Sequence, residues 1–167
     1  MYPNYQSKTI MNKKSLAVLA FQLLFSMQVQ AQEFESASTA VANMGIGWNL
    51  GNTLDANDAS KTWTTTEQHE TCWGQPVTKP ELLRMMKEAG FGAIRVPVTW
   101  YQEMDSNGKV NEAWMKRVKE VVDYVIDNGM YCIINVHHDT GDGTQWLHAS
   151  MTTYNNVKSK YEYLWKQ

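Results

Sequence analysis

The chain has 167 residues with a formal net charge of -2 at pH 7, and 43% of its residues are hydrophobic. This composition is ordinary for a globular protein. The small net charge excludes binding to nucleic acid or to an acidic membrane surface through overall charge alone. The chain has two cysteines, Cys72 and Cys132, which is too few for a disulfide-stapled scaffold. Because they fall at opposite ends of the domain predicted below, we expect both to be free thiols.

The first predicted element is a secretory signal peptide within residues 1–31. Two lysines precede an apolar run from Leu16 to Phe25, and residues 29–31 form a cleavage site of the A-x-A kind. We expect translation to start at Met11 and cleavage to fall before Gln32, so that the mature protein is secreted to the periplasm, the cell surface or the medium. The apolar run is too short to span a bilayer, so no membrane span is expected.

Residues 32–167 are predicted to form one α/β domain. A glycine-rich strand and a long polar loop come first, and strands and helices then alternate, which indicates parallel strands joined by crossover helices. Thr78 and Glu81 have the spacing of a capping box, Asn111 caps the next helix, and Gly90 and Gly129 end the two helices. The predicted strands cover 45–52, 91–98 and 130–136, and the predicted helices cover 78–89, 111–128 and 154–167.

Polar side chains gather at the carboxyl ends of the predicted strands, where parallel α/β folds place their chemistry. Alternation along 93–98 turns Arg95 to the inward face, where a buried arginine needs carboxylate partners. The same alternation in the third strand turns Asn135 and His137 inward. No G-x-G-x-x-G phosphate loop follows the first strand, which argues against a doubly wound nucleotide-binding fold. A closed barrel instead brings Asn52, Arg95 and His137 together at one end.

The stretch His137-His138-Asp139 leaves three interpretations open. Adjacent histidines on a strand point to opposite sides and chelate poorly, so no metal and no cofactor is expected, although a metal site built on His137 and Asp139 stays an alternative. In the second interpretation, one histidine is a hydrogen-bonded core residue. We favour the third, in which an imidazole donates a hydrogen bond or carries a proton in a site.

Three stretches together resemble the N-terminal part of glycoside hydrolase family 5, and among its members the bacterial endo-β-1,4-glucanases: GWNLGNTLDA, TCWGQPVTKPELLRMMKEAGFGAIRVPVTWY and INVHHDTGDG. The resemblance runs from about Val41 to the end of the chain. It implies a (β/α)8 TIM barrel, of which about three of the eight βα units are present. It also implies a retaining hydrolysis of β-glucan polysaccharide by two glutamates, one acting as acid and base and the other as nucleophile.

The resemblance assigns roles to individual residues. Arg95 is similar to the arginine on the second strand of the family, which orients the nucleophile carboxylate. His137 is similar to the histidine that lies beside the reacting sugar. Asn52, which matches a polar residue at the end of the first strand, and His138 are expected to line the sugar subsites.

Several aromatic and acidic residues fit the same picture. Trp100 and Trp146 follow the second and third strands, where they would either stack on pyranose rings or anchor their loops. Asp55 and Asp139 are candidate acceptors for sugar hydroxyls. Trp48 and Trp114 are expected to be core residues.

Neither catalytic glutamate of the family is recognised in the chain. No Asn-Glu-Pro motif occurs, and a complete barrel takes about 250 residues. We therefore expect residues 32–167 to be an incomplete catalytic domain that is inactive alone, in an endoglucanase whose full-length form is a monomer. Its expected partner is cellulose, xyloglucan or mixed-linkage glucan, and not nucleic acid. The alternative is a truncated, non-catalytic polysaccharide-binding module.

Overall fold

The computed structural model describes residues 34–140, 146–147 and 150–167. The chain divides into two units, Met1–Ser36 and Ala37–Gln167, and the second unit holds every element described below. The predicted signal peptide and its cleavage site lie outside the described residues. No helix within the described ranges is both long and apolar enough to cross a membrane. Cys72 and Cys132 are free thiols, as predicted.

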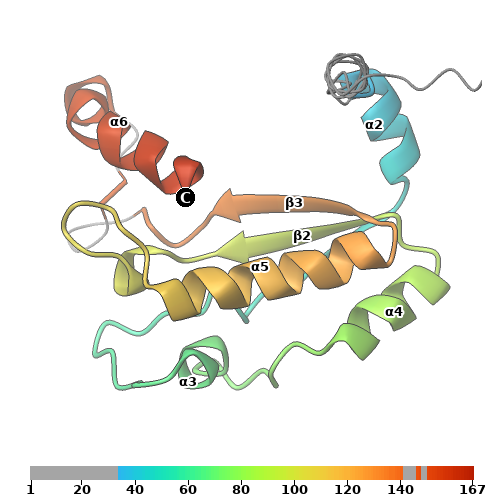
Figure 1. The fold of residues 1–167 in the computed structure, drawn as a ribbon, viewed down its shortest axis with the longest axis horizontal. Helices are drawn as coiled ribbons and strands as arrows, with labels where there is room; N and C mark the ends of the chain where they lie inside the picture. The colour runs from blue at the N-terminus through green and yellow to red at the C-terminus, as the bar shows by residue number, and fades with distance from the viewer. Residues whose placement is uncertain (1–33, 141–145, 148–149) are drawn as a thin grey trace, which may run out of the picture. The chain divides into compact units, whose positions relative to one another are not determined.

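A parallel sheet of three strands, in the order β1-β2-β3, forms the centre of the second unit (Figure 1). β1 (Gly47–Asn49) pairs with the first half of β2 (Ala93–Val98), and β2 pairs along its whole length with β3 (Tyr131–Val136). β1 is shorter than the predicted strand over 45–52, because only Gly47–Asn49 pair with β2 and the backbone is left-handed at both Gly45 and Asn52. The predicted parallel arrangement is confirmed.

Helices connect these strands in the predicted alternation. α5 ends before Gly129, and its first turn is capped by Asn111, whose side chain accepts a hydrogen bond from the amide of Ala113 at 2.8 Å. Figure 1 shows α5 running along the sheet. The helices are α2 (Ala37–Met44), α3 (Thr66–Glu70), α4 (Pro80–Glu88), α5 (Glu112–Asp127) and α6 (Met151–Lys166), with a 3-10 helix η1 at Tyr101–Glu103.

Thr78 does not cap α4, so this part of the prediction is wrong. The N-cap residue is Lys79, and no side chain caps the helix. The backbone of Thr78 is instead held from both sides, because its amide donates to Glu70 at 2.7 Å and its carbonyl accepts from Arg117 at 2.6 Å. These two bonds keep Thr78 outside the helix, and α4 begins at Pro80, which favours a first helical turn.

The predicted loop over 53–77 contains a helix that the sequence analysis missed. Thr65 and Gln68 form a capping box at the start of α3, in which each side chain bonds to the backbone of the other residue. The T-x-x-Q spacing over 65–68 was the signal available in the sequence. α3 gives this long connection a rigid part before it reaches α4.

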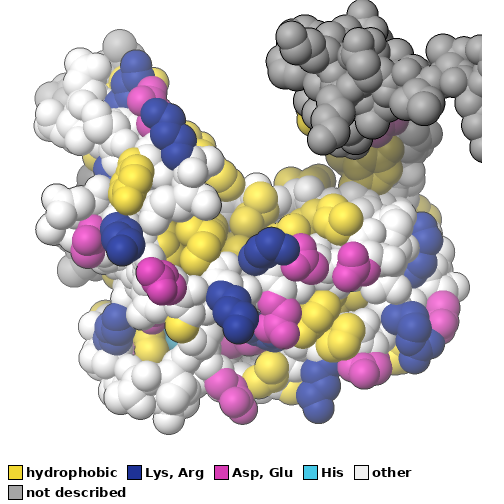
Figure 2. All heavy atoms as spheres, in the orientation of Figure 1, with side chains coloured by type: hydrophobic (Ala, Val, Ile, Leu, Met, Phe, Trp, Pro, Cys, Tyr) yellow, Lys and Arg dark blue, Asp and Glu magenta, His cyan; other side chains and the backbone are white. Residues whose placement is uncertain are grey.

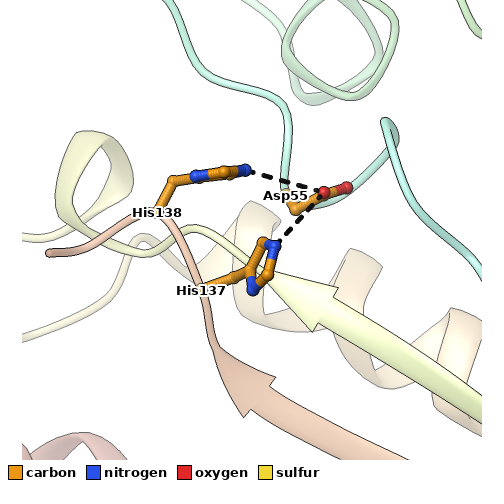
Figure 3. Close-up of side chains that lie close together, drawn as sticks. All are labelled: Asp55, His137 and His138. Carbon is orange, nitrogen blue, oxygen red and sulfur yellow. Dashed lines mark ion pairs between the residues drawn. The ribbon is translucent and has the colours of Figure 1, made fainter.

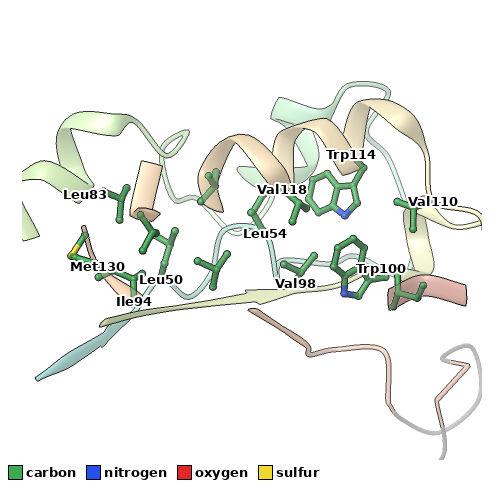
Figure 4. Close-up of a cluster of buried hydrophobic side chains, with 14 residues drawn as sticks. Leu50, Leu54, Leu83, Ile94, Val98, Trp100, Val110, Trp114, Val118 and Met130 are labelled. Carbon is green, nitrogen blue, oxygen red and sulfur yellow. The ribbon is translucent and has the colours of Figure 1, made fainter. Parts of the chain in front are cut away.

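The hydrophobic core lies between the sheet and α5 (Figure 4). Ile94, Val96 and Val98 of β2 are fully buried, and Trp114 of α5 is 1% exposed, as predicted for a core residue. Burying a side chain of this size stabilises the fold by about 1.5–3 kcal/mol, so this layer holds β2 firmly against α5. Residues on the opposite face of β2 therefore point away from the core.

The surface of α5 that faces away from the core carries both positive and negative charges. Figure 2 shows basic and acidic side chains interspersed over this face of the molecule. Lys119 and Asp123 form an ion pair along α5, and Arg84 and Glu88 form another along α4. Exposed pairs of this kind contribute little to stability.

Candidate active site

Arg95 lies on the face of β2 opposite the core, as alternation along the strand predicts. It is half-buried, whereas Ile94 and Val96 on either side of it are fully buried. Its Nη1 donates to Oδ1 of Asn49 at 2.7 Å, and its Nη2 lies 3.1 Å from Nδ1 of His137. Since Asn49 ends β1 and His137 follows β3, the guanidinium of Arg95 links the end of β1 to the residue after β3 across the inner face of β2.

The partners of Arg95 differ from those that the sequence analysis expected. An inward arginine predicted carboxylate partners, but its bonds within the described residues go to an amide oxygen and an imidazole nitrogen. Both of these partners are neutral, so the positive charge of Arg95 can still pair with an anionic group from another part of the protein.

Asn49 takes the place at the end of the first strand that was expected for Asn52. Asn49 pairs in register with Arg95, so both side chains lie on the same face of the sheet. Asn52 is exposed and lies three residues further along, and its own backbone is in the left-handed conformation. The convergence of Asn52 with Arg95 and His137 is thus corrected to Asn49, while a contact of Asn52 with sugar stays a prediction. Alternation from Gly47 was the signal that could have identified Asn49.

His137 and His138 turn toward the same carboxylate, that of Asp55 (Figure 3). Their Nε2 atoms lie 4.0 and 3.9 Å from Oδ2 of Asp55, and the two rings are in edge contact with centroids 4.4 Å apart. Adjacent histidines would diverge on a continuous strand, but β3 ends at Val136, so strand alternation does not apply to His137 and His138. We call Asp55, His137 and His138 the histidine–aspartate cluster.

The loop that carries Asp55 is held in place by buried contacts. Asp55 is 3% exposed, and its Oδ1 accepts a hydrogen bond from the amide of Thr53 at 3.0 Å. The next residue, Ala56, has its carbonyl oxygen 2.9 Å from Nε2 of His69. His69 is itself stacked between the rings of Trp63 and Trp114, at centroid distances of 4.3 and 4.1 Å. These contacts fix the loop and leave Oδ2 of Asp55 facing the two histidines.

The cluster offers three potential metal ligands within 4.8 Å of one another. The hydrogen bonding of His137 opposes a metal there. Arginine can only donate, so Nδ1 of His137 accepts from Arg95, and the neutral ring then carries its proton on Nε2, the atom that faces Asp55. A protonated nitrogen cannot ligate a cation, and the charge of Arg95 repels one.

The surroundings of His137 keep it neutral. Burial lowers the pKa of His137, and electrostatic interaction with His138 and with the charge of Arg95 lowers it further, against the opposing effect of Asp55. The separations of 4.0 and 3.9 Å are too long for direct hydrogen bonds, so the facing atoms can still bond to a third group that lies beside them. Nε2 of His137 can donate to that group and Oδ2 of Asp55 can accept from it, which is the pattern that recognises a hydroxyl.

Asp139 has a structural role, so both predictions made for it are wrong. It is completely buried, and its carboxylate accepts hydrogen bonds from the amides of Trp100 and Tyr101 at 2.9 and 2.7 Å and from the indole of Trp146 at 2.7 Å. Burial raises the pKa of Asp139, although these hydrogen bonds oppose the rise. With its oxygens used in this way, Asp139 is available neither to a sugar nor to a metal shared with His137.

The two tryptophans proposed to stack on sugar differ in their surroundings. Trp100 is 2% exposed within the hydrophobic core, so its ring faces are covered and the stacking prediction is wrong. Trp146 is half-buried and donates to Asp139, and the ammonium of Lys160 lies 5.3 Å from its ring centroid. The loop-anchoring alternative therefore fits both residues. A sugar contact by Trp146 stays a prediction.

A parallel βα arrangement with an arginine and paired histidines on one side of its sheet is compatible with part of a TIM barrel. Comparison with known proteins identifies the family. A family model described as cellulase (glycosyl hydrolase family 5) matches residues 55–167. The chain belongs to glycoside hydrolase family 5, and its three strands and their helices are part of a (β/α)8 barrel.

Individual relatives agree with this assignment. Endoglucanase A of Clostridium longisporum is 44% identical over 142 residues, which are 84% of this chain and 27% of that protein. A solved broad-specificity endoglucanase from an uncultured bacterium is 72% identical with a TM-score of 0.79, over 86% of this chain and 40% of that one. A family 5 enzyme of Prevotella bryantii, solved with a xyloglucan tetradecasaccharide, is 48% identical with a TM-score of 0.75, over 81% and 39%. The chain thus spans less than half the length of these relatives.

Proposed function

We propose that the full-length protein is a secreted, retaining endo-β-1,4-glucanase and that this chain supplies the first three βα units of its barrel. In this proposal the chain contributes Arg95 and His137 as supporting residues, while both catalytic glutamates come from later strands. The observation that carries the proposal is the link from Arg95 of β2 to Asn49, which ends β1, and to His137, which follows β3.

Arg95 prepares the position of the nucleophile in this mechanism. Its guanidinium is fixed by two neutral partners, so its charge stays available to a carboxylate that enters the barrel from another strand. A cation beside a carboxylate favours the ionised form, which is the form that attacks the anomeric carbon. In a retaining enzyme the second carboxyl lies about 5–5.5 Å away, protonates the leaving oxygen, and then activates the water that releases the sugar.

The histidine–aspartate cluster binds the sugar in this proposal. A pyranose hydroxyl both donates and accepts hydrogen bonds, which matches a donor on His137 and an acceptor on Asp55. Broad-specificity endoglucanases are among the relatives, and one from Ruminococcus champanellensis was solved with bound cellotriose. These relatives support a β-glucan as the substrate class, covering cellulose, xyloglucan and mixed-linkage glucan.

The test compares the full-length protein, its Arg95→Ala variant and this chain alone on carboxymethylcellulose and xyloglucan. We expect the full-length protein to release reducing sugar, Arg95→Ala to lose about 100-fold or more in kcat/KM because an electrostatic contact in the site is removed, and the chain alone to be inactive. Arg84→Ala is the matched control, since Arg84 is exposed on α4 and pairs with Glu88. Hydrolysis by the pure chain, or an inactive full-length protein, would contradict the proposal.

The alternative of a binding module has less support. Ile133 lies in register with Arg95 on the inward face of β3 and is 42% exposed. An exposed apolar residue on an inner sheet face is typical of a surface that further barrel strands cover. Retention of the chain alone by cellulose as a stable monomer would favour the binding module over the catalytic proposal.

A further inference from the structure

Trp73 is an exposed aromatic residue beside the histidine–aspartate cluster. Its ring meets the ring of His138 edge-on, with centroids 5.4 Å apart and an interplanar angle of 62°. Its exposed fraction is 42%, whereas Trp63, Trp100 and Trp114 are at most 7% exposed. Trp73 therefore differs from the core tryptophans, because much of its indole surface is open to solvent next to polar groups.

The ring of Trp73 is held in this position by the loop that also carries Asp55. Its Nε1 donates to the carbonyl of Asn57 at 2.7 Å, and Asn57 follows Asp55 by two residues. The polar edge of the indole is thus satisfied, and the apolar face is left over. Because the ring is already anchored, little side-chain freedom is lost when a ligand packs on it. An anchored, open indole beside hydrogen-bonding groups is suited to a ligand that has both an apolar face and hydroxyls.

We infer that Trp73 is the stacking platform for one glycosyl unit of the bound glucan, adjoining the unit whose hydroxyl lies within the histidine–aspartate cluster. The inference rests on the proposed function and extends it to a residue that determines substrate binding. The β-glucopyranose ring has C–H faces that pack against a flat indole and equatorial hydroxyls that project from its rim. A ring stacked on the exposed part of Trp73 brings some of those hydroxyls near His138, whose ring centroid lies 5.4 Å from that of the indole.

The experiment measures KM and kcat of the full-length protein on cellohexaose. Trp73→Ala is expected to raise KM about ten-fold, the equivalent of losing roughly 1.4 kcal/mol of binding. kcat is expected to stay within about two-fold, because stacking away from the reacting bond binds the ground state and the transition state equally. Trp73→Phe keeps an apolar face and should raise KM less than the alanine variant. Trp165→Ala is the control, since Trp165 lies on α6 and is 43% exposed.

The outcomes separate the inference from the proposed function. An active wild type whose KM is unchanged in Trp73→Ala would overturn the inference and leave the glucanase proposal standing. An inactive wild type would overturn both. If Trp73→Ala does not fold, Trp73→Phe still tests the inference, because it removes the indole whose fluorescence a stacked sugar would change. A change in tryptophan fluorescence on cellohexaose binding that persists undiminished in this variant would overturn the inference.

Discussion

At the scale of single residues, His137 shows how a neighbour sets the chemistry of a side chain. Arg95 has no acceptor atom, so their contact assigns the proton of His137 to Nε2. Burial and nearby positive charge lower the pKa of His137, and the neutral form is kept at neutral pH. A neutral imidazole with its proton directed at Asp55 can donate a hydrogen bond to a hydroxyl. Because it carries no charge, it does not compete with Arg95 for the carboxylate of the proposed nucleophile.

We expect His137 to titrate below its ordinary pKa of 6.5 when followed by NMR, and Arg95→Ala to raise the midpoint because a positive charge is removed. Since the folded pKa lies below the unfolded one, the unfolded state binds more protons between the two values. The stability that His137 contributes is therefore complete above pH 6.5 and is lost as the pH falls through the folded pKa.

Arg84→Ala, which removes a charge on α4, should leave the His137 midpoint unchanged. A midpoint at or above 6.5 in the wild type would contradict the neutral form that the contacts of His137 favour.

The sequence predicted the position of a side chain correctly where local backbone structure sets it, and wrongly where contacts with distant segments set it. The inward direction of Arg95 follows from strand alternation, which is a local property, and it was predicted. The burial of Trp100 depends on the core between β2 and α5, and its stacking on sugar was wrongly predicted. Asp139 was misjudged for the same reason, because its hydrogen-bond donors come from η1 and from the segment around Trp146.

At the scale of elements, a buried ion pair fastens α3 to α5. Glu70 of α3 is completely buried, and its carboxylate accepts from Nε and Nη2 of Arg117 at 2.8 and 3.0 Å as well as from the amide of Thr78. Arg117 also bonds Glu120 at 2.6 Å, but the side chain of Glu120 is 50% exposed. Arg117 thus has one buried and one exposed carboxylate partner, so the contributions of the two ion pairs to stability can be compared within one protein.

Glu70→Gln should lower the free energy of unfolding of the full-length protein by about 3–5 kcal/mol, because it leaves Arg117 without its buried counterion. Glu120→Gln should cost about 0–1 kcal/mol, as for an exposed pair. Urea unfolding followed by circular dichroism measures both. Equal losses in the two variants would show that burial of Glu70 does not govern the strength of the link.

The elements themselves were predicted unevenly. α4, α5 and the two longer strands follow from apolar spacing and glycine stops, which are strong local signals. α3 was missed because it has five residues, too few to show a periodic apolar stripe. The length of β1 depends on where β2 stops pairing with it, and a single sequence does not contain that information.

At the scale of the whole molecule, the described sheet has two unpaired edges, at β1 and β3. With the exposed inner face at Ile133, these edges are what part of a closed barrel presents before neighbouring strands cover it. The solved relatives, of which the chain covers 40% and 39%, contain the additional length. The monomeric state expected for the full-length protein requires that its later strands pair with these sheet edges.

The secretion proposed for the full-length protein can be measured on the mature chain. We expect mass spectrometry of the exported protein to find Gln32 at the N-terminus, because residues 29–31 form the cleavage site. Replacing both Lys13 and Lys14 with Glu should reduce export, since the basic segment before the apolar run is required. Replacing Lys79 and Lys87 of the mature domain in the same way should not. Recovery of the protein in the cytoplasm with residues 11–31 still attached would contradict the proposal.

The sequence by itself determined the α/β alternation, the inward face of Arg95 and the resemblance to glycoside hydrolase family 5, because these depend on periodicity and on motifs of adjacent residues. The tertiary structure decided that Asn49 is the partner of Arg95, that both histidines face Asp55, and that Trp73 stays open beside them. These contacts join segments far apart in the chain, and their geometry depends on the residue at which each strand ends. Local propensity is weakest at that point, and packing between elements decides it.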